Sequence, residues 1–264
     1  MKELFVRTLT GVTLIILVAG AILLGPQLLA AMVLMVALMG ILELFALYRL
    51  HRDFPHYMMA LAAVLVIPVT LMILQYHWSP WWLAAVVAVW IIGLIWSGSV
   101  VPGILMLLWI CFPLAAFLAL GFAPEQGRYL PLLPLTVISL IWVNDTFAYL
   151  TGSWLGRHPL IPALSPGKTW EGFIGGMLCT LAGGYTISRI SGTLSGMEWV
   201  LLSLLVSLLA LAGDLFESRL KRKQQVKNSG RVLPGHGGIL DRFDSLFFTA
   251  PIILILHYLF NHWI

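Results

Sequence analysis

The sequence contains few charged residues. Asp, Glu, Lys and Arg make up 10% of its 264 residues, whereas roughly a quarter of an ordinary soluble domain is charged. Hydrophobic residues make up 60%, so water cannot be the main solvent of the chain. This composition excludes an ordinary soluble enzyme and predicts an all-α polytopic integral membrane protein. We expect no nucleic-acid partner.

Cysteine is also scarce. Cys111 and Cys179 both fall within apolar runs, where a thiol acts as a small apolar packing group. The two cysteines form no CxxC pair, and none of the histidines has metal-ligand spacing. A disulfide framework and a zinc site are therefore excluded as organising features.

Long apolar runs are abundant, and a spanning helix needs about 20 such residues. Nine runs predict transmembrane helices: Leu4–Leu24, Gln27–Tyr48, Tyr57–Leu74, Trp81–Trp96, Val101–Gly121, Leu130–Thr151, Gly172–Arg189, Met197–Ala212 and Leu246–Leu259. The third and fourth runs could instead form a re-entrant pair, so eight or ten spans stay open. Without repeats or linkers, we expect one membrane domain over 1–264, with apolar spans in 1–121 and the functional residues in 130–264.

The positions of Lys and Arg predict the orientation. If the N-terminus is cytoplasmic and the spans number nine, thirteen of the fifteen basic residues lie inside, and only Arg128 and Arg189 lie outside. This asymmetry follows the positive-inside rule. The loop at Ser97–Ser99 carries no charge to hold it inside. The short loops are typical of a bacterial inner membrane.

Polar residues within the spans mark candidate sites. Glu43, near the inner end of the second span, is interpreted as structural, because it could snorkel or pair with Arg49 or Arg52. Asn144 and Asp145 interrupt an apolar run, where a carboxylate costs a few kcal/mol unless it is paired or hydrated. Catalysis, a proton relay and a buried hydrogen bond between helices all remain open for this pair.

The segment Ser165–Gly172 precedes the seventh span and could face a phosphate. Its Pro and Gly break a helix, its amides could contact an anion, and Lys168 adds a positive charge at the N-terminus of the next helix. It is not a Walker A loop, because Pro162 occupies the position of the required earlier glycine. An ordinary capping turn is the alternative.

The segment from Gly213 to Ser245 is the richest in polar residues. Asp241 and Asp244 are three residues apart and would share a helix face, and Asp214 lies at the inner end of the eighth span. Carboxylates together with substrate phosphates are what Mg²⁺ prefers, and the basic residues between them would hold those phosphates. The basic run could alternatively serve topology and anionic lipid headgroups alone. That alternative leaves the acids and Gly237-Gly238 unexplained, because glycine permits close backbone approach.

This segment closely resembles the signature of the phosphatidate cytidylyltransferase (CDP-diacylglycerol synthase) family. The signature has the form S-x-[apolar]-K-R-x4-K-D-x-[small]-x2-[apolar]-P-x-H-G-G-[apolar]-x-D-R-[apolar]-D, and it begins here at Ser218 and ends at Asp244. Every specified position matches except one, where Asn228 replaces the family's Asp after Lys227. Asn144–Tyr149 and Ser165–Gly172 are also similar to the family.

The resemblance implies transfer of the cytidylyl group of CTP to phosphatidic acid, with Mg²⁺ as cofactor. Asp214 and Asp241 would hold a metal pair, one member of which could be a monovalent ion such as K⁺. Asp145 and Asp244 would support that site. The residues expected to bind phosphate or shape the pocket are Ser165, Lys168, Ser218, Lys221, Arg222, Lys227, His236, Gly237, Gly238 and Arg242. The site would face the cytoplasm, and a homodimer is compatible with the family.

Two other classes of function remain as alternatives. Another CTP-dependent lipid enzyme, such as a polyprenol kinase or an ether-lipid cytidylyltransferase, would keep the nucleotide site and change the acceptor. A transporter is the default for a membrane protein with an intramembrane acid. The sequence lacks the pair of interrupted halves that many transporters carry, which disfavours this alternative.

Overall fold

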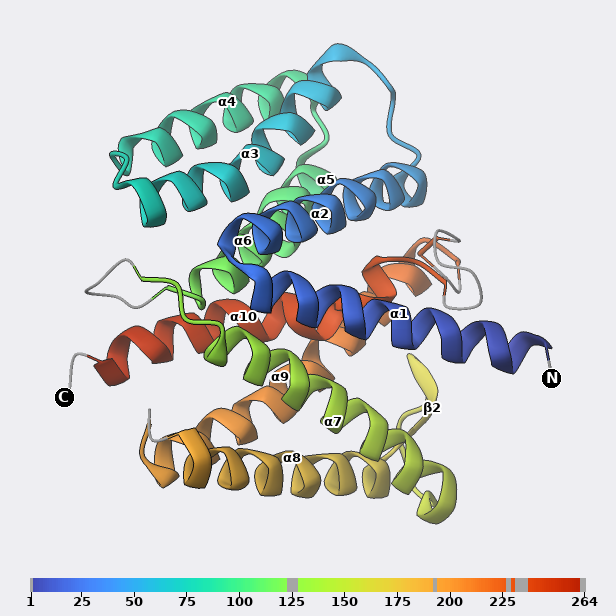
Figure 1. Cartoon of the computed structure of the whole chain (residues 1–264). Coiled ribbons are helices and arrows are strands. Elements are labelled where there is room, and N and C mark those ends of the chain that lie inside the picture. The colour runs from blue at the N-terminus through green and yellow to red at the C-terminus, as the bar shows by residue number, and fades with distance from the viewer. Residues whose placement is uncertain (1, 123–127, 192–193, 227–228, 231–236, 262–264) are drawn as a thin grey trace. The chain divides into compact units, whose positions relative to one another are not determined.

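The structure is a computed structural model that describes residues 2–122, 128–191, 194–226, 229–230 and 237–261. Most of the described residues are helical (Figure 1). The chain forms two compact units. The first comprises Met1–Leu135 and Gln224–Phe243, and the second comprises Thr136–Lys223 and Asp244–Ile264. The chain therefore returns to the first unit after completing most of the second.

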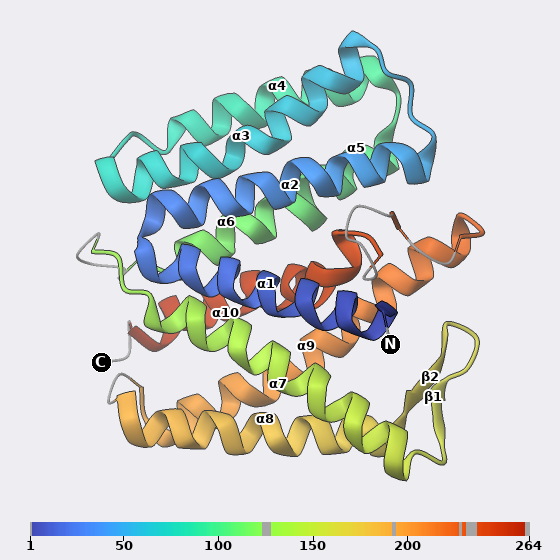
Figure 2. The same ribbon diagram turned by 45° about the vertical axis from the view of Figure 1, so that its right-hand side comes forward.

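The first unit contains the first five predicted spans as helices. They are α1 (Lys2–Leu24), α2 (Pro26–Tyr48), α3 (Phe54–Tyr76), α4 (Trp81–Ser97) and a continuous stretch of α5 (Val100–Ile104), η1 (Leu105–Cys111) and α6 (Phe112–Ala119). Helices α3 and α4 lie side by side in both views (Figures 1 and 2). Gly93 permits this packing, because a Cβ there would lie 3.0 Å from the backbone of Met59. The segment η1 has π-helical geometry just before Pro113, which cannot donate to the carbonyl four residues earlier.

A hydrogen-bonded cluster joins two turns of the first unit. Asp53 caps α3 by accepting a hydrogen bond from the backbone N–H of His56, and its Oδ1 lies 2.5 Å from Nδ1 of the same histidine. The other ring nitrogen of His56 lies 2.9 Å from the hydroxyl of Ser99, in the α4–α5 turn. The uncharged turn at Ser97–Ser99 is therefore fixed beside the turn that carries Arg49 and Arg52.

The second unit contains the remaining predicted spans and a short hairpin. Its elements are α7 (Leu132–Leu155), β1 (Pro159–Ile161), β2 (Ser165–Thr169), α8 (Trp170–Ser191), α9 (Gly196–Lys223) and α10 (Leu240–Asn261), although Leu132–Leu135 and Leu240–Phe243 belong to the first unit. Strands β1 and β2 pair antiparallel. This short hairpin was not predicted, whereas the other elements of the unit are helices, as expected. Gly184 permits close packing of α8 on α9, because a Cβ there would overlap Ser203.

Each of the nine predicted spans coincides with one helix or helical stretch. Among the described residues, six helical stretches are long and apolar enough to cross a membrane: Pro26–Tyr48, Phe54–Tyr76, Val100–Ala119, Leu132–Leu155, Gly196–Lys223 and Leu240–Leu259. Shorter apolar stretches are Leu9–Leu24 and Trp81–Ser97. The prediction of a polytopic helical membrane protein is thus confirmed, while the count of nine spans and the orientation stay predictions.

Candidate active site

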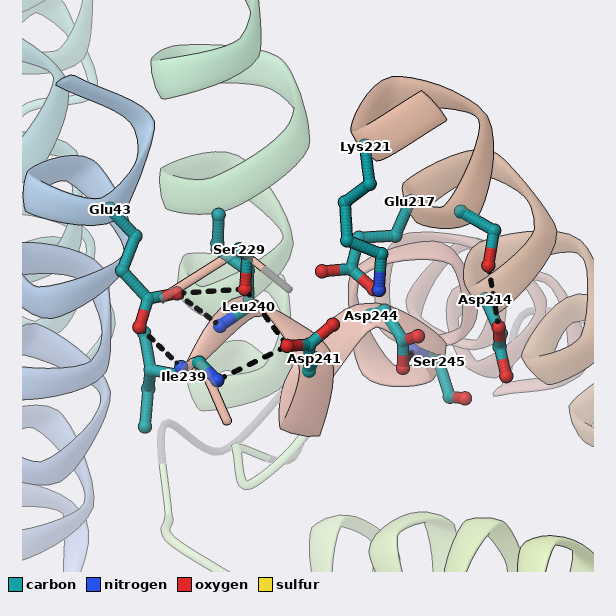
Figure 3. A network of polar contacts seen from close by, with 12 residues as sticks. Glu43, Asp214, Glu217, Lys221, Ser229, Ile239, Leu240, Asp241, Asp244 and Ser245 are labelled. Carbon is teal, nitrogen blue, oxygen red and sulfur yellow. Dashed lines mark hydrogen bonds and ion pairs between the residues drawn. The ribbon is translucent and has the colours of Figure 1, made fainter. Parts of the chain in front are cut away.

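The predicted site residue Asp241 lies in the first turn of α10, within the first unit. Its Oδ2 accepts hydrogen bonds from the Ser229 hydroxyl and from the backbone N–H of Gly238, each at 3.1 Å (Figure 3). Gly237 has a φ of 82°, and a Cβ there would lie 3.1 Å from Asp241 Oδ2. The two predicted glycines therefore bring the backbone close to Asp241, and the hydroxyl of Ser229 completes this environment.

Glu43 contacts the same segment, which the sequence did not indicate. Its carboxylate accepts hydrogen bonds from the backbone N–H groups of Ile239 and Leu240 at 2.7 and 3.1 Å, and from the Ser229 hydroxyl at 3.1 Å. The side chain is buried, with 4% exposed, whereas Arg49 and Arg52 are exposed. The structural interpretation of Glu43 holds, but the expected snorkelling or arginine pairing is wrong, because backbone donors satisfy this carboxylate.

In the second unit, the structure brings two predicted residues, Lys168 and Ser218, together around Asp214. The Lys168 ammonium donates to Oδ2 of Asp214, and the Ser218 hydroxyl donates to Oδ1 at 3.3 Å. Lys168 comes from β2, whereas Asp214 and Ser218 are one turn apart on α9. The side chains of Lys168 and Asp214 are 30% and 33% exposed, so solvent and solutes can reach the pair.

Lys221 forms an ion pair that sequence reasoning missed. Its ammonium lies 2.8 Å from the carboxylate of Glu217, one turn earlier on α9, and Glu217 is buried. The spacing of four residues between Glu and Lys is the signal that could have predicted it, because such residues are neighbours on a helix surface. Lys221 thus has an intramolecular partner in addition to its predicted role toward phosphate.

Asp244 is buried on α10, one turn after Asp241. Its Oδ1 accepts a hydrogen bond from the backbone N–H of Ser245 at 2.6 Å. Gly213 makes this part of the second unit compact, because a Cβ there would lie 2.3 Å from the carbonyl oxygen of Asp244. Glycine at this position therefore allows the backbones of α9 and α10 to touch directly before Asp214.

Asn144 provides the buried hydrogen bond between helices that was one of the open interpretations. Its Oδ1 on α7 accepts a hydrogen bond from the Ser207 hydroxyl on α9 at 2.7 Å. Its Nδ2 donates to Asp145 Oδ1 at 3.3 Å. Asn144 is buried and Asp145 is exposed. The adjacent pair therefore divides into a structural amide and a carboxylate that is accessible for another role.

The segment Ser165–Gly172 is a strand followed by a helix start. Ser165 begins β2, and the Thr169 hydroxyl accepts a hydrogen bond from the backbone N–H of Gly172 at 3.1 Å, as a helix cap does. Part of the predicted loop is therefore a strand that pairs with β1, and Thr169 caps the following helix. Contact of this segment with an anion stays a prediction. Glu171 anchors the hairpin, because it accepts hydrogen bonds from the His158 ring and from the Arg157 backbone. These hydrogen bonds also lower the pKa of Glu171 to about 2.

The remaining predicted residues occupy the ends of two helices or lie outside the described residues. Arg222 is exposed in the last turn of α9, and Arg242 is exposed in the first turn of α10. Lys227, His236 and the departure at Asn228 lie outside the described residues. Their expected roles stay predictions.

The residues expected to hold Mg²⁺ fit that ion chemically. Within the described ranges, no three His, Cys, Asp or Glu side chains are grouped closely enough to hold a metal. Mg²⁺ does not require such a group, because it is usually bound by one or two carboxylates, substrate phosphates and water. Asp214 and Asp241 supply hard oxygen ligands, and Asp214 already attracts a cationic group, the ammonium of Lys168.

Comparisons with known proteins identify the family of the chain. The model of the cytidylyltransferase family matches residues 5–260. Curated relatives called phosphatidate cytidylyltransferase include proteins from Staphylococcus aureus (strain COL), 43% identical over 155 residues, and Staphylococcus saprophyticus, 40% identical over 153 residues. Both alignments cover 55% of this chain and 57% of the relative, so the chain matches little more than half the length of these relatives. Because the family model extends over nearly all of the sequence, the chain belongs to the cytidylyltransferase family.

Proposed function

We propose that this protein transfers the cytidylyl group of CTP to phosphatidic acid and forms CDP-diacylglycerol and pyrophosphate. Family membership supports the reaction class, and the names of the relatives support phosphatidic acid as the acceptor. The observation that carries the proposal is the cluster of Lys168, Asp214 and Ser218. It gathers a cation, a carboxylate and a hydroxyl at one end of a membrane helix, within reach of a polar nucleotide and a lipid headgroup.

The chemistry of this transfer requires no protein nucleophile. A phosphate oxygen of the lipid attacks the α-phosphorus of CTP, a new P–O–P bond forms, and the bond from the α-phosphorus to the bridging oxygen of the pyrophosphate group breaks. The protein must therefore bring two anions together and stabilise the charge that develops on the leaving group.

The carboxylates would hold the metal. Asp214 and Asp241 are the proposed ligands, with Asp145 and Asp244 in support and a monovalent ion such as K⁺ as the second metal. Bound Mg²⁺ would neutralise phosphate charge, which favours both binding of CTP and departure of pyrophosphate.

The basic and small residues would bind the substrates. Residues that would contact phosphates are Lys168, Lys221, Arg222, Lys227 and Arg242. Ser165 and Ser218 would donate hydrogen bonds, while His236, Gly237 and Gly238 would shape the pocket. Lys168 and Lys221 each form an ion pair with a carboxylate of α9, which holds both ammonium groups near this helix.

We place this site on the cytoplasmic side of a bacterial inner membrane, where CTP is available. The distribution of Lys and Arg supports this orientation, and the relatives are bacterial. The proposed substrates are CTP and phosphatidic acid, without a nucleic-acid partner. A homodimer would be compatible with this arrangement.

The test is a product assay with the full chain in detergent. CTP labelled in the cytosine ring is supplied with or without phosphatidic acid, and with Mg²⁺ or a chelator. The proposal expects pyrophosphate and labelled CDP-diacylglycerol only when both lipid and Mg²⁺ are present. Folding is checked by size-exclusion chromatography of the same sample.

The same assay, repeated with a polyprenol and with an ether-lipid phosphate as acceptors, separates the alternative functions. A CTP-dependent lipid kinase would release CDP instead of pyrophosphate, because it transfers the terminal phosphoryl group. An ether-lipid cytidylyltransferase would release pyrophosphate only with an ether-lipid phosphate. A transporter would leave CTP unchanged under every condition. Any of these results from folded protein would overturn the proposal.

A further inference from the structure

Glu43 is a buried acid that accepts hydrogen bonds from a segment far along the chain. It lies on α2 and is 4% exposed, and its hydrogen-bond donors Ile239 and Leu240 follow it by 196 and 197 residues. A carboxylate in an apolar environment is costly unless hydrogen bonds or charges compensate it. Three hydrogen-bond donors surround the Glu43 carboxylate. Its burial is therefore compensated by specific hydrogen bonds.

Two of these donors are peptide N–H groups at the start of α10. The first N–H groups of a helix have no partner within the helix, and the helix dipole makes this end attractive to negative charge. Glu43 therefore caps α10 from a different helix. Asp241 is the residue that follows the second of these amides, so the cap fixes the backbone directly before this predicted metal ligand.

Ser229 connects the two carboxylates. Its hydroxyl lies 3.1 Å from Glu43 Oε2 and 3.1 Å from Asp241 Oδ2 (Figure 3). A hydroxyl has one hydrogen, so the two carboxylate oxygens share it or compete for it. A cation bound to Asp241 would weaken the hydrogen bond from Ser229 to Asp241. The hydroxyl would then donate more strongly to Glu43. Ser229 thus links the hydrogen bonding of Glu43 to the binding of a cation by Asp241.

At two positions of the surrounding backbone, a residue larger than glycine would collide with Glu43. A Cβ on Gly230 would lie 2.4 Å from Glu43 Oε1, and a Cβ on Gly238 would lie 2.5 Å from Glu43 Oε2. Both distances are far below van der Waals contact. Two glycines therefore allow the backbone to close around the Glu43 carboxylate, and the same backbone carries the N–H that binds Asp241.

We propose that Glu43 is a positioning residue for the metal site. It holds the start of α10 through two amides and, through Ser229, sets the orientation in which Asp241 binds a divalent cation. Glu43 touches neither substrate nor metal in this role. The inference rests on the proposed function, which assigns Asp241 to the metal.

The test compares Glu43→Gln and Ser229→Ala with the unchanged protein, in detergent. Loss of a residue that orients a metal ligand typically costs about 10- to 100-fold in metal affinity. We expect Glu43→Gln to raise both the Mg²⁺ concentration for half-maximal activity and the dissociation constant of Mn²⁺, measured by electron paramagnetic resonance, by about that factor. Ser229→Ala keeps both amide contacts of Glu43 and should shift both values in the same direction by less.

Glu198→Gln is the matched control. Glu198 also caps a helix start, since it accepts a hydrogen bond from the backbone N–H of Ser195, but it is only half-buried and lies outside the candidate site. A purely structural effect would lower the fraction of active protein without changing the metal concentration at half-saturation. Both metal constants of Glu198→Gln should match those of the unchanged protein.

The two proposals can fail separately. If the unchanged protein forms CDP-diacylglycerol and folded Glu43→Gln retains its metal constants, the positioning role is overturned and the proposed function stands. If the unchanged protein is inactive but Glu43→Gln weakens Mn²⁺ binding, the positioning role stands and the proposed reaction is wrong. If Glu43→Gln does not fold, Ser229→Ala decides, because unchanged Mn²⁺ binding in that variant contradicts the link to Asp241.

Discussion

At the scale of single residues, the ion pairs of the candidate site are more informative about function than about stability. The pair between Lys168 and Asp214 is about one-third exposed on each side, and such pairs contribute about 0 to 1 kcal/mol to folding. Holding a long lysine side chain in one place also costs conformational entropy. A role in presenting the ammonium to an anionic substrate explains the arrangement better than a role in stability.

Replacement of Lys168 by Met should therefore affect substrate binding more than folding. A hydrogen bond from a charged group is worth about 2 kcal/mol, which corresponds to a roughly thirtyfold increase in the KM for CTP. The apparent melting temperature should change little. Steady-state kinetics with varied CTP at saturating Mg²⁺ measures the effect, and Lys223→Met, an exposed lysine in the last turn of α9, is the control. An unchanged KM in folded Lys168→Met would exclude this lysine from the nucleotide site.

At the scale of elements, hydropathy predicted where the helices lie but not all of their ends. Helix α9 continues to Lys223, beyond the predicted end at Ala212, because polar residues such as Glu217 and Lys221 pair along its surface. Helix α10 begins at Leu240, where Glu43 caps it, instead of at the predicted Leu246. That cap joins residues almost 200 positions apart, and no local pattern signals such a contact.

The residues of the candidate site could likewise be predicted from the sequence only in part. Ser218 and Lys168 could be predicted because the family signature and the Ser165–Gly172 block contain them, and Asp214 because it is an acid at the inner end of the eighth predicted span, four residues before the signature. Ser229 and Glu43 could not, since a single serine in a polar loop and a lone acid in an apolar helix have many ordinary interpretations. The β-hairpin was missed because its strands are short and Pro159, Pro166 and Gly167 suggest a loop.

The contacts among Asp53, His56 and Ser99 join the α2–α3 turn to the α4–α5 turn, and we expect their strength to depend on pH. The hydrogen bond from the His56 side chain lowers the pKa of Asp53 below its usual value. A group with a lowered pKa in the folded state stabilises it fully above the usual pKa, and this contribution is lost as the pH falls through the lowered value.

We therefore expect the unchanged protein to be more heat-stable than Asp53→Asn at neutral pH, and this advantage to disappear in acid. Asn retains helix-capping ability, so the variant isolates the charge. Apparent melting temperatures at one scan rate, measured from pH 7 to pH 3, provide the comparison. A difference between the two proteins that stays constant with pH would contradict the role of the Asp53 charge.

At the scale of the whole molecule, the distribution of polar groups agrees with one orientation. The hydrogen bond between His56 and Ser99 places the uncharged α4–α5 turn beside the α2–α3 turn, which carries Arg49 and Arg52. Both turns must then lie on the same side of the membrane. The α2–α3 turn carries Arg49 and Arg52, so the positive-inside rule predicts that both turns face the cytoplasm. Helices α3 and α4 can then either both cross the membrane, as predicted, or form the re-entrant pair.

The orientation predicts opposite accessibility of two exposed serines. Ser79, between α3 and α4, should face the outside, and Ser153, in the last turns of α7, should face the cytoplasm. In a background with Cys111→Ala and Cys179→Ala, a membrane-impermeant maleimide should label Ser79→Cys in intact cells and should label Ser153→Cys only after the membrane is opened. Labelling of both variants in intact cells, or of Ser153→Cys alone, would contradict the orientation. If Ser79→Cys reacts only in denatured protein, α3 and α4 do not cross the membrane, and the chain has fewer than nine spans. Labelling of Ser79→Cys alone in intact cells would instead place Lys168 and Asp214, which lie on the same side as Ser153 in this topology, where cytoplasmic CTP can reach them.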